Sequence, residues 1–396
     1  MVNNERIAAD MNVLSKIPGR FAGSEGERAI LHAVRERLPG GLAGRIEGFV
    51  AHVAPSLVLG LHDLCLVLAG ILGFWKPHIA LAFAAVTTLS LMAEGAGKTS
   101  LFRWMLPKWA SYNLVVRRKA ESALGTVIFA APLDAPGWRF SLPWVRGQRA
   151  MRVTFAAAIT ITVMLLLRSL GETGGPRTRE IYVVSLIILA LGFGLGLLAH
   201  RRQGSGVDEA SGPAALLELM RQFRDRPIPG VDLWFAFTGC GRAYQGGMEA
   251  FLQLHQKTLV DPVLVISFDD PGRPPLQAAV AEGPLFPQHH RPTGPALVER
   301  LSWAGVMISP VDRVGISDAR AALNQGYRAI GLVGGEGTAS PEATRRAAEV
   351  AETMARWFGD DLARVADNRT ALQELARSTT ESATPIPVLE TNEPKS

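Results

Sequence analysis

Four long apolar stretches interrupt this 396-residue chain and limit what it can fold into. They come as two pairs, Ser56–Trp75 with Pro77–Ala93 and Val153–Leu167 with Ile181–Ala199. Only the first contains an acidic residue, Asp63, which follows His62, and none contains Lys or Arg. A membrane-spanning helix needs about 20 mostly apolar residues, and here apolar side chains run all round each stretch instead of along one stripe. The pattern predicts two transmembrane helical hairpins.

The overall composition supports this interpretation and excludes other classes of protein. Hydrophobic residues make up 48% of the chain and charged residues only 19%, against about 25% charged in ordinary soluble domains. Disorder of most of the chain is excluded, because disordered segments have low hydrophobicity. The chain has two cysteines, Cys65 and Cys240, so a disulfide-rich scaffold is excluded as well.

The charges beside the apolar stretches predict the topology. Each hairpin leaves and returns on one side of the membrane, so all the polar sequence shares one compartment. Near the membrane this side has 11 basic residues: Arg45, Lys98, Arg103, Lys108, Arg117, Arg118, Lys119, Arg146, Arg149, Arg201 and Arg202. The far side has four: Lys76, Arg168, Arg177 and Arg179. The positive-inside rule places the polar part in the cytoplasm, so we expect a protein of a bacterial-type inner membrane.

The remaining features of the sequence agree with that location. Met1–Asp10 is polar and no apolar segment of a signal peptide follows it. The formal net charge of +5 belongs mostly to the membrane flanks. No basic run alternates with aromatic residues, so we expect no nucleic-acid partner.

The polar sequence predicts one α/β domain, interrupted by the two hairpins. The domain takes residues 1–54, 95–150 and 201–377; the hairpins take 55–94 and 151–200, and 378–396 are predicted to be a disordered tail. Short apolar strands alternate with amphipathic helices, which indicates a mostly parallel or mixed sheet with helices on both faces. The predicted strands are Asn113–Arg117, Thr126–Ala131, Val231–Phe237, Val263–Phe268 and Ala329–Val333. The predicted helices are Glu25–Leu38, 211–225, 246–257, 295–304 and Pro341–Phe358.

Several segments, in order along the chain, resemble the M28 family of zinc aminopeptidases. They cover nearly all the polar sequence, and the match from Val207 carries the family's Asp-x-Ala-Ser-Gly helix start. The matching segments are Arg20–Ser24, Tyr112–Leu114, Val127–Asp134, Val207–Glu218, Phe237–Gly247, Val265–Asp269, Ser317–Ala319 and Gly326–Ile330. The resemblance implies a zinc aminopeptidase-like fold, in which two zinc ions activate a bridging water and a carboxylate acts as base.

Three acidic positions of the family's site are kept in this chain. On the resemblance, Asp134 corresponds to the residue that orients the first histidine ligand. Asp208 corresponds to the aspartate that bridges the two metal ions, and Asp269 to a further ligand. A capping role explains Asp208 equally well, because it begins a predicted helix.

The other positions of the family's site have changed. The first histidine ligand is Pro132 here and the last is Ala319. The pair of glutamates, base and ligand, is Cys240 and Gly241. Zinc needs three or four protein ligands, so we expect neither bound metal nor another cofactor, and no catalytic residues.

These substitutions favour a catalytically inactive, membrane-embedded relative of the M28 peptidases. The family includes non-catalytic members of the nicastrin and nicalin type, so the resemblance implies a binding or scaffold subunit of a membrane complex. The expected partners are the lipid bilayer and either another protein or a second copy of the chain.

Two other functions are compatible with the sequence. One is a hydrolase with a rebuilt site, formed by Cys240, Asp208, Asp269 and His289 or His290, in which zinc could take part. The other assigns transport or ion handling to His62 and Asp63, since ionisable residues inside a membrane are costly. The alternative for this pair is a structural role, near headgroups or bonded to a neighbouring helix.

Overall fold

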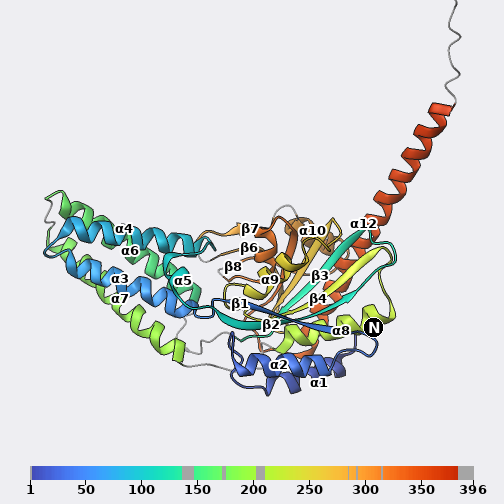
Figure 1. The fold of residues 1–396 in the computed structure, drawn as a ribbon, viewed down its shortest axis with the longest axis horizontal. Coiled ribbons are helices and arrows are strands. Elements are labelled where there is room, and N and C mark those ends of the chain that lie inside the picture. Colours follow the sequence, from blue (N-terminus) through green and yellow to red (C-terminus); the bar gives the residue numbers. More distant parts are fainter. Residues whose placement is uncertain are drawn as a thin grey trace, which may run out of the picture.

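The structure is a computed structural model that describes residues 2–135, 147–171, 175–201, 210–283, 285–290, 293–313 and 315–381. A bundle of long helices extends from one side of an α/β body, and the last helix projects from the other side (Figure 1). Asp208 and the start of its motif lie outside the described residues, as does the predicted tail from residue 382.

Within the described residues, nine strands form one sheet. Their bounds are β1 Gly44–Ala51, β2 Trp109–Arg118, β3 Gly125–Pro132, β4 Val231–Thr238, β5 Val263–Asp269, β6 Leu276–Glu282, β7 Gln288–His289, β8 Ser309–Arg313 and β9 Arg328–Gly334. The order is β1-β2-β4-β3-β5-β9-β6-β7, with β8 beside β6. The central strands β4, β3, β5 and β9 are parallel, whereas β1, β2 and β6 pair antiparallel with their neighbours in this order.

Helices cover both faces of this sheet. One face packs against α1 (Asn4–Ser15), α2 (Glu25–Glu36), α8 (Ser211–Asp225), α10 (Thr293–Trp303) and α12 (Pro341–Glu381). The other packs against α9 (Gly246–His255) and α11 (Asp318–Asn324). Along β3, Val127 and Phe129 point to the first set, and Ile128 and Ala130 to the second, because successive strand residues face opposite sides. The predicted fold class is therefore confirmed.

The four predicted membrane segments are helices: α3 (Pro55–Leu72), α4 (Pro77–Gly95), α6 (Gly147–Ser169) and α7 (Pro176–Arg201). By length and composition, each is long and apolar enough to cross a membrane. The helices share a small apolar core of their own, while side chains such as Leu68 and Leu191 point outward, 50% and 61% exposed. Outward apolar side chains suit contact with lipid. A short helix, α5 (Leu101–Met105), leads from α4 to β2.

The last helix is longer than the sequence predicts. The predicted helix ends at Phe358, whereas α12 continues to Glu381 and so includes the first four residues assigned to the tail. Its first half packs on the sheet through Ala347, Ala351 and Met354. Its second half projects from the body (Figure 1).

Candidate functional site

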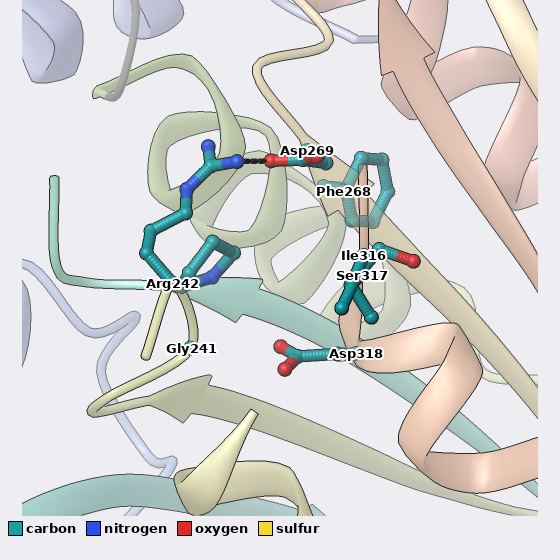
Figure 2. Close-up of a pocket in the computed structure, with 8 residues that line it drawn as sticks. Gly241, Arg242, Phe268, Asp269, Ile316, Ser317 and Asp318 are labelled. Atoms are coloured by element: carbon teal, nitrogen blue, oxygen red, sulfur yellow. Dashed lines mark ion pairs between the residues drawn. The ribbon is translucent and has the colours of Figure 1, made fainter. Parts of the chain in front are cut away.

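Residues that correspond, on the resemblance, to the metal site of the M28 family lie together where the parallel strands end. Pro132 at the end of β3 pairs with Thr238 at the end of β4, and β5 ends beside them at Asp269. In sheets of this kind, ligands bind at the carboxyl ends of the strands. A small, narrow pocket lies there (Figure 2), lined by Pro132, Gly241, Arg242, Phe268, Asp269, Ile316, Ser317 and Asp318.

Arginine side chains neutralise the carboxylate of Asp269. Arg242, from the loop after β4, forms an ion pair with Asp269 (Figure 2) and a second one with Asp270, at 2.5 Å. Arg313, at the end of β8, forms an ion pair with the other oxygen of Asp269. Asp269 is 2% exposed, so these charge-assisted contacts lie out of water, where they are strong. Asp269, which on the resemblance corresponds to a metal ligand, is thus already paired with Arg242 and Arg313.

The second kept carboxylate, Asp134, supports the loop after β4. It accepts the backbone N–H groups of Gly241, at 2.8 Å, and Arg242, at 3.0 and 3.1 Å. Burial, together with the nearby charge of Glu27, raises its pKa well above the usual range. Asp134 therefore works in this structure as an acceptor that fixes the loop bearing Arg242.

Glu27 of α2 supports the same loop from the other side. Its carboxylate accepts the N–H of Cys240 at 2.6 Å, the hydroxyl of Ser111 at 2.7 Å and the N–H of Gly23 at 2.9 Å. Burial raises its pKa despite these bonds. The loop needs such support, because Cys240, Tyr244 and Gln245 have φ values between +50° and +62°, a costly region for residues with a Cβ atom.

Two of the changed positions fill each other's space. A Cβ atom added to Gly241 would lie 2.6 Å from the Cβ of Pro132, well inside van der Waals contact. A glutamate at position 241 would therefore collide with Pro132 unless the backbone moved. Ala319, the third changed ligand position, is fully buried in the apolar cluster between the sheet and α9.

Cys240 and the two histidines lie in separate surroundings. Cys240 is fully buried among Ala22, Ala51 and Ala243, and burial raises the pKa of its thiol. His289 is exposed on β7, whereas His290 is buried with its Nε2 3.7 Å from the carboxylate of Glu282. In the described structure no contact brings either histidine to Cys240, so the residues of the rebuilt hydrolase site are not gathered together.

Sequence reasoning missed several charged residues of this region. Glu282 accepts the hydroxyl of Ser317 at 2.9 Å, and the guanidinium of Arg320 donates to the Glu282 carbonyl at 2.9 Å. Asp318 accepts the hydroxyl of Thr238 at 2.7 Å, and burial raises its pKa to about 6. Asp318 follows Ser317 in a matching segment, which is the one sequence signal that could have pointed to it.

The described residues do not fit a pair of zinc ions. Among them, which leave out Asp208, no three His, Cys, Asp or Glu side chains come together as metal ligands. Pro132, Gly241 and Ala319 offer no side-chain donor, and Asp269 is paired with arginines. Zinc prefers nitrogen and sulfur donors, and the one thiol nearby points into an apolar cluster.

The end of the helical bundle that adjoins the body contacts this region. The guanidinium of Arg103 in α5 lies 4.5 Å from the ring centre of Tyr244 and 3.8 Å from the carboxylate of Glu94, at the end of α4. Gly95 packs against Leu285, in the loop after β6. The loop that carries Arg242 is therefore in contact with α5, which follows the membrane-type helix α4 in the chain.

Comparison with solved structures establishes the fold of the body. A glutaminyl cyclase from an Acidobacteriales bacterium matches with a TM-score of 0.51 at 11% identity, over 91% of this chain and 96% of that one. A zinc-dependent exopeptidase from Parabacteroides distasonis matches with a TM-score of 0.50 at 10% identity, over 88% and 96%. An aminopeptidase from Aneurinibacillus sp. strain AM-1 matches with a TM-score of 0.51 at 11% identity, over 88% and 92%.

Identities this low show the fold alone, and the fold is the zinc aminopeptidase-like one expected from the sequence. No protein-family model matches the chain, and no curated protein matches its sequence. The function is therefore argued from the site.

Proposed function

We propose that this chain is an integral membrane protein whose zinc aminopeptidase-like body is catalytically inactive and serves as a binding subunit of a membrane complex. The observation that carries the proposal is the pairing of Arg242 and Arg313 with Asp269. The positive charge that a metal ion would supply at this position comes from the chain itself.

The lack of a carboxylate at the position where the family has its general base supports the same proposal. The base position of the family is Cys240, whose buried thiol has a raised pKa and lies outside the pocket lining. A general base contributes about 10²–10⁴ to a rate. Asp134 and Glu27, two buried carboxylates beside this position, are used as acceptors by the loop backbone. Asp318, in the pocket lining, accepts the Thr238 hydroxyl, so no described carboxylate takes the place that the family's base has at position 240.

The way the body is held favours a fixed platform over an enzyme that opens and closes. Both hairpins are inserted within the sequence of the α/β body, so the chain passes between the body and the bundle four times. The contacts of Arg103 and Leu285 hold the site loops against that bundle. On the positive-inside rule, this body lies on the cytoplasmic side, and its partner is a protein or a second copy of the chain.

Native mass spectrometry of the full-length protein, released from membranes in a mild detergent, tests this proposal. The expected spectrum shows the chain without zinc and together with a protein partner or a second copy. Aminopeptidase and glutaminyl cyclase assays on the same sample are expected to give no turnover above that of a sample with R242Q. Stoichiometric zinc with turnover would overturn the proposal.

A further inference from the structure

A carboxyl group is enclosed in the helical bundle. Asp63 lies eight residues after the first residue of α3, about 12 Å along the helix axis, and is 1% exposed. The side chain of Thr154, in α6, is within hydrogen-bonding reach of it. A Cβ atom added to Gly192 in α7 would lie 2.5 Å from its Oδ2 atom. The carboxyl group is therefore pressed between three helices.

One oxygen of this carboxyl group, Oδ1, is buried and has no hydrogen-bond partner among the residues that the structure describes. The helix backbones beside it offer no free N–H, since the interior N–H groups of a helix are used within the helix. His62, the neighbouring residue, points elsewhere: its Nδ1 contacts the Val58 carbonyl at 2.8 Å and its Nε2 contacts the Ser90 hydroxyl at 3.0 Å.

No cationic side chain of the described residues pairs with Asp63. Glu94, at the end of α4, pairs with Arg103 of α5, and Arg168, near the end of α6, donates to the Phe74 carbonyl. Apart from these, the titratable and charged side chains that the structure describes on α3 and the helices packed against it are His62, Cys65, His78, Arg152, Arg177, Arg179, Glu180 and Tyr182.

The energetics favour a neutral acid at this position. An ionised carboxylate out of water costs several kcal/mol unless it is paired, and within a membrane such groups are costly by default. A metal cation would need several oxygen ligands, whereas the described side chains bring one hydroxyl, that of Thr154. A proton needs only the carboxyl group itself.

We infer that Asp63 is a proton-binding site in the helical bundle, and that its bound proton keeps α3 packed against α7 at Gly192. When the proton leaves, a negative charge is left against the backbone of α7, and the Thr154 hydroxyl is the one side-chain donor described beside it. The carboxylate then has to reach water, which separates the two helices. The bundle is thereby sensitive to pH at a group outside the candidate site.

Infrared spectroscopy of the full-length protein in lipid vesicles tests this inference. The difference spectrum between the wild type and D63N, near pH 7, is expected to contain the C=O stretch of a protonated carboxylic acid. T154V is expected to shift that band, because the hydroxyl near the carboxyl group is lost. D360N, which changes an exposed aspartate, is expected to leave the band unchanged. A spectrum that shows only an ionised carboxylate for Asp63 would overturn the inference.

A chemical test on the wild type does not depend on the folding of a variant. Dicyclohexylcarbodiimide modifies protonated carboxyl groups in apolar surroundings, and peptide mass spectrometry locates the product. Modification of Asp63 is expected, with a rate that falls about tenfold per pH unit above the titration midpoint. Equal rates in sodium chloride and choline chloride are expected. Protection by sodium at constant pH would show a metal-cation site instead, and no modification of Asp63 would also overturn the inference.

Discussion

Replacing Arg242 by glutamine removes a cation from the centre of the candidate site. The side chain of Arg242 is 14% exposed and is paired with Asp269, which is 2% exposed, and with Asp270, which is 21% exposed. The substitution leaves both carboxylates without this partner. Removing one partner of a buried ion pair costs about 3–5 kcal/mol. We expect about 3 kcal/mol here, because Arg313 still neutralises Asp269.

The assay is thermal unfolding of the purified protein in detergent, followed by tryptophan fluorescence. In a domain of 150–250 residues, 1 kcal/mol changes the melting temperature by about 2–4 °C, so R242Q is expected to melt about 6–12 °C lower. The matched control is R345Q, which removes an i,i+4 ion pair with partners 34% and 42% exposed. Such pairs contribute about 0.3–0.5 kcal/mol, so R345Q is expected to melt within about 2 °C of the wild type.

A double variant separates the ion pair from other effects of R242Q. If the loss comes from an unpaired carboxylate, R242Q combined with D269N loses less than the two single variants added together, because contacting residues are not additive. A decrease in R242Q no larger than that in R345Q would refute the reasoning, since Arg242 would then not stabilise the site.

Three further predictions concern single groups. In the folded protein Asp318 stays neutral up to about pH 6, whereas in the unfolded chain it ionises near pH 4. As the pH rises from 4 to 6, the wild type is therefore expected to lose roughly 3 kcal/mol of stability relative to D318N. Equal pH profiles of the two proteins in urea unfolding would contradict this. Brominated lipids are expected to quench the fluorescence of Trp104, which is 74% exposed on α5, but not that of Trp303, which is 79% exposed on the body. Fluorescence of variants that lack one or the other tryptophan checks this prediction. In a C65S background, Cys240 is expected to resist iodoacetamide until the protein is unfolded, and rapid labelling of the native protein would contradict its burial.

The sequence predicts those helices and strands whose own residues favour a single kind of secondary structure. The run Val231–Phe237 is almost wholly apolar and short, and it is β4, buried along its whole length. The helix 211–225 was predicted at its observed bounds, since Ser-Gly-Pro precedes an amphipathic pattern. The apolar stretches were long enough for the helices to be recognised without tertiary information.

Other elements could not be predicted, because their own residues are ambiguous. β6 has the sequence Leu-Gln-Ala-Ala-Val-Ala-Glu, whose alanines favour a helix equally well, and it is a strand because β9 and β8 pair with it. β1 mixes charged residues and glycines with apolar ones, so its alternation is weak. Both depend on neighbours that are distant along the chain.

The sequence shows which residues differ from the family's site, but it does not show which side chains meet there. The positions of Pro132 and Gly241 could be compared with a family motif, whereas their packing against each other needs coordinates. Arg242 and Arg313 are ordinary loop and strand-end residues in the sequence. They pair with Asp269 only because the loop after β4 and the end of β8 reach the same edge of the sheet. The inactive state and the binding role stay predictions.

The most direct test of the account is a zinc titration of the purified full-length protein, with aminopeptidase turnover measured at each zinc concentration. The account predicts no saturable zinc binding at one or two ions per chain and no turnover, for the wild type and for R242Q alike, because Pro132, Gly241 and Ala319 supply no ligand. Tight binding of zinc that brings turnover with it, and that is lost in D269N, would contradict the account.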